Sequence, residues 1–224
     1  MTFFDEQFHA YLRALSENNN THWFDENRKW YEDSVKEPFY DFVDEMILQL
    51  RSIDPEIRIE PEEAIFRING DIRYSKEKIP YKTWMCANIS VFGKRKKDFP
   101  GFFIQADADT LVLAGGVYQP DKEYISEIRK LIVENPDRWY DATDEAFKKQ
   151  FGGFVTDTYK IIPKEYRDIG AEIPELYNKQ FYFRCTLPAS LLLMPDCANL
   201  IAEIFRPAAK IHHFLKEACL VTVN

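Results

Sequence analysis

The sequence predicts an α+β protein in which N-terminal helices pack on a mainly antiparallel sheet, at about residues 64–118, followed by further helices. Two observations support this prediction. Apolar residues recur at helical spacing in the first third, whereas the middle consists of short apolar runs separated by polar connectors. No repeat or linker divides the chain, so residues 1–224 are predicted to form a single domain.

The first fifty residues predict three helices. The first carries its apolar residues on one face, and Asn20 or Thr21 can cap the second after a polar break. Pro38 fits the first turn of a third helix better than the interior of a long one, so we expect a break near Glu37. The apolar stripe then continues to Leu50.

The middle of the chain predicts short strands. Their expected ranges are 64–74, 84–92, 101–107 and 110–117. Residues 93–98 would form a charged hairpin tip and 107–110 a tight turn, which is typical of an antiparallel meander. The later elements are a helix opened by Pro120-Asp121, a short helix around 142–150, a strand at 181–187 and a helical end at 196–218, broken or kinked at Pro207.

The composition predicts a packed core and a cytoplasmic location. Hydrophobic residues make up 46% of the chain and aromatic residues 15%, which is typical of a globular protein with a ring-rich core. The N-terminus is acidic where a signal peptide would be basic, and no segment approaches the roughly 20 apolar residues that cross a bilayer, so no membrane is expected. The four cysteines lack CxxC spacing, which favours free thiols.

Charge is unevenly distributed along the chain. The net charge is −8, but residues 64–97 hold nine basic and two acidic side chains, so this segment carries +7 and the remainder −15. The acidic remainder would repel a polyanion, so nucleic acid is disfavoured as a partner.

The segment 64–74 is predicted to be one continuous strand with a polar face. Side chains alternate along a strand, and the polar face consists of Arg67, Asn69, Asp71 and Arg73. Asn69-Gly70 is also a strong hairpin signal. A two-residue turn there would pair an apolar with a charged residue at each facing position, so the continuous strand is preferred.

Two interpretations of this polar face stay open. Arg67 and Arg73, flanking Asp71, could form a buried and fully paired row of charges. Alternatively, the guanidinium groups present donors to a carboxylate or phosphate ligand, with Asp71 holding one of them in place. The excess of basic side chains nearby favours the ligand-binding interpretation. The side chains expected to fold back over the strand end are Lys76, Tyr81 and Lys82.

Two further features could belong to the same site. Gly115-Gly116 ends a strand before a helix, where backbone N–H groups can approach an anion, or the glycines merely relieve crowding. Arg28 could reach the same cleft, although stacking on Trp and pairing with Asp25 or Glu32 is the preferred interpretation.

No metal, nucleotide or nucleophile motif is found in the sequence. The histidines lack zinc-like spacing. Asp107, Asp109 and Asp121 form the only acidic grouping suited to magnesium, and turn positions explain them equally well. The catalytic residues, the cofactor, the oligomeric state and the existence of a reaction are left open.

Three ordered motifs give the chain a family resemblance. They are an Asn-Asn and Trp-Phe motif at 19–28, a Phe-Arg-Ile motif at 66–83 and Ala-Gly-Gly-x-Tyr-x-Pro at 114–120. Together they resemble a bacterial and fungal family, the domain of unknown function 2461, over about residues 8–205. The resemblance implies a shared α+β fold and no assigned activity. Many relatives have Arg at the Gly70 position, so this chain has one cation fewer.

The sequence thus predicts a protein that binds a small anionic molecule, phosphate- or carboxylate-bearing, in an Arg-lined cleft. Arg67 and Arg73 would orient the anion, and Asn69 and Tyr81 would add neutral hydrogen bonds. The alternative is a non-catalytic interaction module whose basic strand and loop, with residues 94–97, dock an acidic partner.

Overall fold

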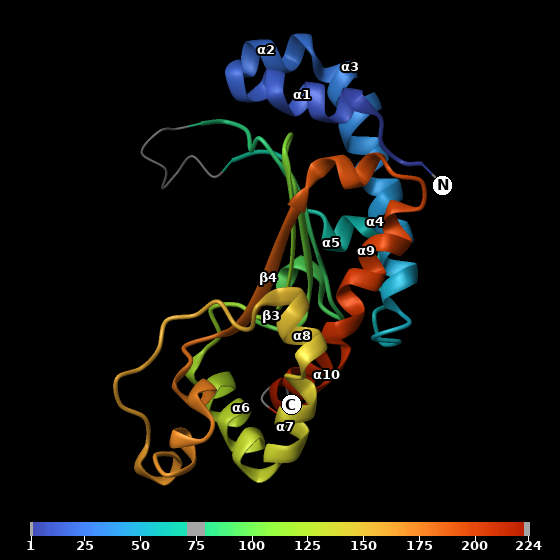
Figure 1. Ribbon diagram of the computed structural model, residues 1–224. Helices are drawn as coiled ribbons and strands as arrows, with labels where there is room; N and C mark the ends of the chain where they lie inside the picture. The colour runs from blue at the N-terminus through green and yellow to red at the C-terminus, as the bar shows by residue number, and fades with distance from the viewer. Residues whose placement is uncertain (1, 71–78, 222–224) are drawn as a thin grey trace. The chain divides into compact units, whose positions relative to one another are not determined.

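The predicted α+β architecture is confirmed (Figure 1). The computed structural model describes residues 2–70 and 79–221. The chain divides into two compact units, which we call unit 1 and unit 2. Unit 1 comprises Met1–Lys94, Phe103–Leu113 and Thr186–Glu203. Unit 2 comprises Arg95–Phe102, Ala114–Cys185 and Ile204–Asn224.

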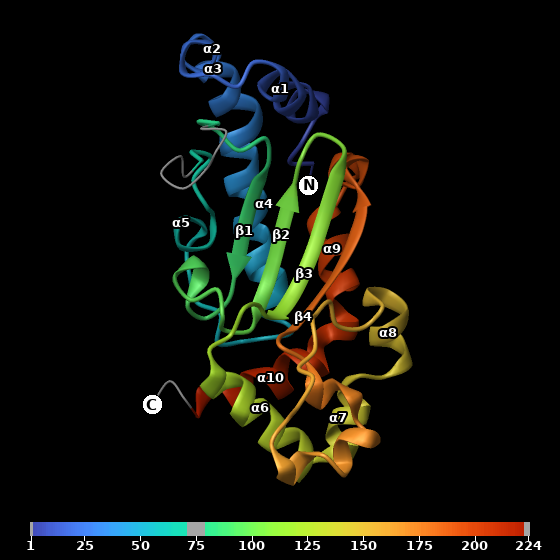
Figure 2. The ribbon, with the colours of Figure 1, turned by 90° about the vertical axis from the view of Figure 1, so that its left-hand side faces the viewer.

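Within the described residues the sheet has four antiparallel strands, in the order β1-β2-β3-β4 (Figure 2). They span Met85–Ile89 (β1), Gly101–Ala106 (β2), Thr110–Val117 (β3) and Phe181–Pro188 (β4). The predictions of strands at 84–92, 101–107, 110–117 and 181–187 are confirmed. Every residue of β1 is buried, as expected for a strand that is covered on both faces.

The predicted strand at 64–74 is wrong as a regular element. A short helix, α5, occupies Pro61–Ala64, started by a proline in its first turn and by a capping box between Glu60 and Glu63. The chain after it makes only isolated antiparallel bridges, from Ile65 to Ala87 and from Asn69 to Tyr81. Residues 71–74 lie outside the described part of the chain.

Asn69-Gly70 does not form a two-residue turn. The Gly70 N–H donates to the Pro80 carbonyl oxygen and the Lys82 N–H to that of Ile68, each at 2.8 Å. Gly70 also lacks the positive φ that a tight Asn-Gly turn requires. The preference for an extended chain at this point is therefore confirmed.

The N-terminal helices belong to unit 1. They are α1 (Glu6–Glu17), α2 (Thr21–Glu26), α3 (Arg28–Tyr31), the π-helical turn η1 (Glu32–Lys36) and α4 (Glu37–Leu50). Asn20 caps α2 as predicted, because its side chain accepts a hydrogen bond from the Trp23 N–H at 3.0 Å. Unit 1 is rich in aromatic contacts: the Tyr11 ring alone lies within 6 Å of three others.

The predicted helix break near Glu37 is wrong. The Glu37 N–H donates to the carbonyl of Glu32, five residues back, and Glu37 has helical dihedral angles of φ −60° and ψ −47°. A π turn is wider than an α turn, so it makes room for the ring of Pro38 in the first turn of α4. The helix therefore passes through the proline without ending.

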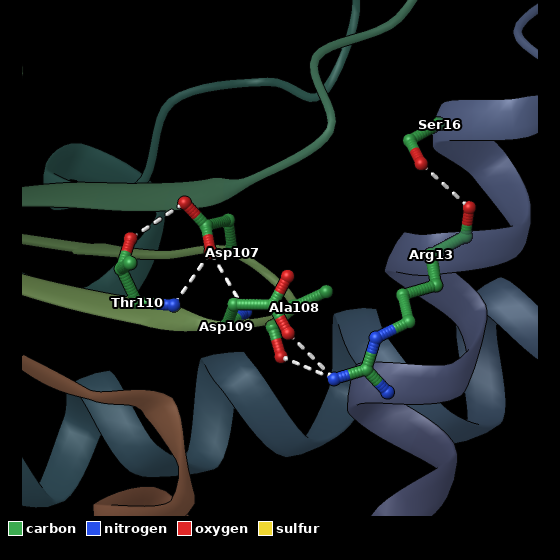
Figure 3. Close-up of polar contacts among 6 residues, drawn as sticks. All are labelled: Arg13, Ser16, Asp107, Ala108, Asp109 and Thr110. Atoms are coloured by element: carbon green, nitrogen blue, oxygen red, sulfur yellow. Dashed lines mark hydrogen bonds and ion pairs between the residues drawn. The ribbon is translucent and has the colours of Figure 1, made fainter.

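The turn between β2 and β3 is formed as predicted (Figure 3). Asp107 accepts hydrogen bonds from the N–H groups of Asp109 and Thr110 at 2.8 and 2.7 Å, and from the Thr110 hydroxyl at 2.7 Å. Burial alone would raise the pKa of Asp107, but these hydrogen bonds outweigh it and lower the pKa. Arg13 of α1 donates to Asp109 at 2.6 Å and to the Ala108 carbonyl at 3.3 Å, which ties α1 to the turn.

Unit 2 is a helical and aromatic assembly. Its helices are α6 (Lys122–Glu134), α7 (Pro136–Ala142), α8 (Glu145–Phe151) and α10 (Ala209–Leu220), with α10 packed on α6 and α7. The helix α9 (Cys197–Phe205) is separated from α10 by a 3₁₀ turn, Arg206–Ala208, so the predicted kink at Pro207 is confirmed. The rings that meet in the core of this unit are Trp139, Phe147, Phe151, Phe154, Phe181, Phe183 and Phe214.

Short 3₁₀ turns complete the fold, at Gly93–Arg95, Lys164–Tyr166, Ile169–Ala171, Pro174–Tyr177 and Ala189–Leu193. Among the described residues, no helix combines the length and the apolar character needed to cross a bilayer.

Candidate functional site

Unit 1 contains a pocket of about 310 Å³, which we call the tyrosine–arginine pocket. Its ionisable and amide lining residues are Arg28, Tyr31, Glu32, Lys36, Tyr40, Arg67, Asn69 and Tyr81. Four of them, Arg28, Arg67, Asn69 and Tyr81, are candidates predicted from the sequence. They come from two stretches of chain that are far apart in sequence, the N-terminal helices and the bridged segments around Asn69 and Tyr81.

The segment around Ile68 presents its polar side chains outward. Arg67 and Asn69 are exposed, and Ile68 between them is only 6% exposed. This alternation agrees with the predicted polar face over the residues that are described. A buried row of paired charges does not fit Arg67, because its side chain reaches solvent.

Tyr81 is held in place by an asparagine that the sequence analysis did not single out as a site residue. The Asn19 amide donates to the Tyr81 carbonyl oxygen at 2.8 Å and accepts from the Tyr81 N–H at 3.1 Å. The Tyr81 ring stacks on Phe24 with centroids 4.0 Å apart and planes at 11°. The only signal for this role was the position of Asn19 in the first family motif, since the two residues are 62 apart.

Arg28 pairs with Asp25 as predicted, but it stacks on Phe24 and not on a tryptophan. Its guanidinium lies 5.4 Å above the Phe24 ring and pairs with Asp25 at 2.6 Å. The hydrogen bond that Arg28 donates to Asp25 raises the pKa of Arg28. Arg28 and Arg67 both line the pocket.

The helical wall of the pocket was missed by the sequence analysis. Glu32 and Lys36 come from the π turn η1 and Tyr40 from α4. With Arg28 they follow a spacing of four residues, which is the signal that could have revealed them. The Lys36 ammonium lies 5.9 Å above the Tyr40 ring, and Glu37, at 3.1 Å, raises its pKa through a hydrogen bond.

Lys82 lies close to this pocket but lines a neighbouring one. Its ammonium donates to the Arg67 carbonyl oxygen at 2.8 Å and lies 5.7 Å above the Phe66 ring. The neighbouring pocket, of about 390 Å³, shares Tyr81 with the first. Three further candidates, Asp71, Arg73 and Lys76, lie outside the described residues.

Gly115 and Gly116 belong to unit 2 and are buried. A Cβ atom at Gly115 would lie 2.7 Å from the Phe183 ring, and one at Gly116 would collide with the Phe181 carbonyl oxygen. Gly116 also has φ +85°, which only glycine adopts freely. These contacts support the interpretation that both glycines relieve crowding against β4.

No group of three or more metal-ligating side chains occurs in the described part of the chain. The turn geometry accounts for Asp107 and Asp109, and Asp121 is the residue that precedes α6. All four cysteines are free thiols. Burial raises the pKa of Cys86 and Cys197 to about 11 and that of Cys219 to about 12, so these thiols are poor nucleophiles at neutral pH.

The fold and the pocket define an α+β protein with a cationic, tyrosine-rich surface pocket built on its N-terminal helices. The chain belongs to the family described as "Conserved hypothetical protein (DUF2461)", whose model matches residues 7–214. The family predicted from the three motifs is thereby confirmed. No curated protein matches the chain.

Proposed function

We propose that the protein binds a small anionic molecule, phosphate- or carboxylate-bearing, in the tyrosine–arginine pocket. The observation that carries the proposal is the convergence of four residues singled out from the sequence, Arg28, Arg67, Asn69 and Tyr81, on one pocket. A cavity near 300 Å³ is the size expected for a small-molecule site.

Each lining group has a role in this proposal. The guanidinium groups of Arg28 and Arg67 donate to the anion, and the Lys36 ammonium adds a third positive charge. Among the described lining residues Glu32 is the one carboxylate, so these residues carry a net charge of about +2. The amide of Asn69 and the hydroxyl of Tyr81 supply neutral hydrogen bonds.

We also propose that the protein acts in the cytoplasm. The four free thiols agree with a reducing compartment. No residue is assigned as catalytic, and the proposal concerns binding alone.

The test is isothermal titration of the protein with inorganic phosphate, pyrophosphate and citrate. Arg67→Gln removes one cationic donor from the pocket. It should weaken the affinity for the tightest-binding of these anions by about tenfold or more, which is the effect of losing one charge-assisted hydrogen bond. Arg58→Gln is the matched control, because Arg58 is exposed and does not line the pocket. Equal losses in both variants, or no binding of any probe, would contradict the proposal.

The interaction module stays an alternative that the structure does not favour. Lys94 and Lys96, from the basic stretch at 94–97, are engaged with the chain itself. The Lys94 ammonium donates to the Glu62 and Ile65 carbonyl oxygens, each at 2.6 Å, and Lys96 donates to the Tyr124 hydroxyl at 2.9 Å. These bonds give Lys94 and Lys96 local roles and leave fewer charges for a partner.

A further inference from the structure

The π turn η1 brings the helical wall of the pocket onto one face. In an α-helix each residue turns by about 100°, so residues four apart drift by about 40° and Tyr40 would lie about 120° from Arg28. A single π turn acts as a one-residue insertion and takes back about 100° of this drift. Arg28, Glu32, Lys36 and Tyr40 can therefore all line the same pocket, as observed.

The carboxylate of Glu32 is not expected in a pocket that binds only an anion. Its carboxylate would repel a phosphate or carboxylate group. Its acidic neighbours are paired, Asp33 with Lys29 at 2.8 Å and Glu37 with Lys36 at 3.1 Å, whereas no side chain in the described ranges donates to the Glu32 carboxylate. Glu32 is exposed and lines the pocket, so its acceptors are available to a ligand.

The aromatic lining adds a second requirement. The Phe24 ring, stacked with Tyr81, and the Phe66 ring both face the pocket. Such surfaces pack against the C–H faces of a ligand, and Asn69 can bond hydroxyl groups beside them. A ligand that satisfies the whole lining carries an anionic end, several hydroxyl groups and a carbon skeleton.

We propose that the anion bound in this pocket is a phosphorylated sugar or polyol, whose phosphate contacts Arg28, Arg67 and Lys36 and whose hydroxyl groups donate to Glu32. This inference rests on the proposed function, and it adds the class of ligand. Glu32 then acts as the residue that distinguishes a hydroxylated phosphate ester from a bare one.

The test compares glucose 6-phosphate with methyl phosphate by isothermal titration near neutral pH. The native protein should bind glucose 6-phosphate at least about tenfold more tightly, because a hydrogen bond to a charged acceptor is lost with methyl phosphate. Glu32→Ala should weaken glucose 6-phosphate binding by about tenfold and leave methyl phosphate unchanged or bound more tightly, since a repulsive charge is removed. The control Asp33→Ala removes the same charge one residue further along, outside the pocket, and should change neither affinity.

The outcomes separate the inference from the proposed function. If methyl phosphate binds, depends on Arg67, and is bound as tightly as glucose 6-phosphate, the sugar-phosphate inference is overturned and anion binding stands. Equal loss of affinity for both ligands in Glu32→Ala would likewise overturn the sugar-phosphate inference and leave anion binding standing. If neither ester binds the native protein and the three anions of the earlier titration also fail, both proposals are overturned.

Discussion

Replacing Asn19 should loosen the pocket and destabilise unit 1. In Asn19→Ala both hydrogen bonds to the Tyr81 backbone are lost, and each is worth about 1 kcal/mol in a half-buried setting. The expected loss is therefore about 2 kcal/mol of unfolding free energy. For a chain of this length, that corresponds to a fall of about 4–8 °C in Tm.

The assay is thermal unfolding followed by circular dichroism, combined with titration of inorganic phosphate. Asn19→Asp is the graded control, because its carboxylate still accepts from the Tyr81 N–H but cannot donate to the Tyr81 carbonyl. It should fall between the native protein and Asn19→Ala, because it keeps one of the two hydrogen bonds. An Asn19→Ala protein with a Tm within about 1 °C of the native value would refute the role assigned to Asn19.

Three further predictions follow from the structure. Gly116→Ala should cost about 3 kcal/mol or more in urea unfolding, because a methyl group would meet the Phe181 carbonyl in a left-handed backbone; Gly152→Ala, with open space around it, should cost only about 1 kcal/mol. The lowered pKa of Asp107 stabilises the folded protein at neutral pH, and this contribution should be lost as the pH falls below about 4, so Asp107→Asn should differ most from the native protein near pH 7 and least near about pH 3. In native protein at about pH 8, a thiol reagent should modify the buried cysteines far more slowly than in denaturant. The buried thiols are Cys86, Cys197 and Cys219.

Each of these can fail in a clear way. Equal costs for the two glycine variants would show that crowding against β4 is unimportant. A constant difference between native and Asp107→Asn protein across the acid range would contradict the direction of the pKa shift. Rapid modification of all thiols without denaturant would show that their burial does not protect them.

Local chemistry made much of the fold predictable. Asn20 as a helix cap and Asp107 as a turn residue both act on backbone groups two or three positions away, so their roles can be read from the adjacent sequence. The strands at 84–117 were likewise predicted from short runs and their connectors. The prediction of one domain over the whole chain stays a prediction.

The errors have two causes: a local backbone feature that side-chain patterns do not show, and contacts between residues far apart in the chain. A proline usually ends a helix, but the π turn before Pro38 makes room for its ring. The spacing of apolar residues does not reveal that the Glu37 N–H donates to a carbonyl five residues back. The bond between Asn19 and Tyr81 spans 62 residues, so no local pattern predicts it. Three residues of the helical wall, Glu32, Lys36 and Tyr40, were missed although they follow Arg28 at a local spacing of four residues.

The division of the chain into units has a consequence for how the protein can be dissected. Each unit consists of three separate segments, and unit 1 is complete only when the segment Thr186–Glu203 is present. The pocket residues all precede Cys86, yet a fragment that ends soon after them would lack two of the three segments of their own unit. A shortened gene product is therefore a poor reagent for studying ligand binding, and a premature stop late in the coding sequence would remove part of the unit that holds the pocket. Inserting a reporter into an exposed loop keeps every segment of both units in one polypeptide, and it is the better route to a labelled protein.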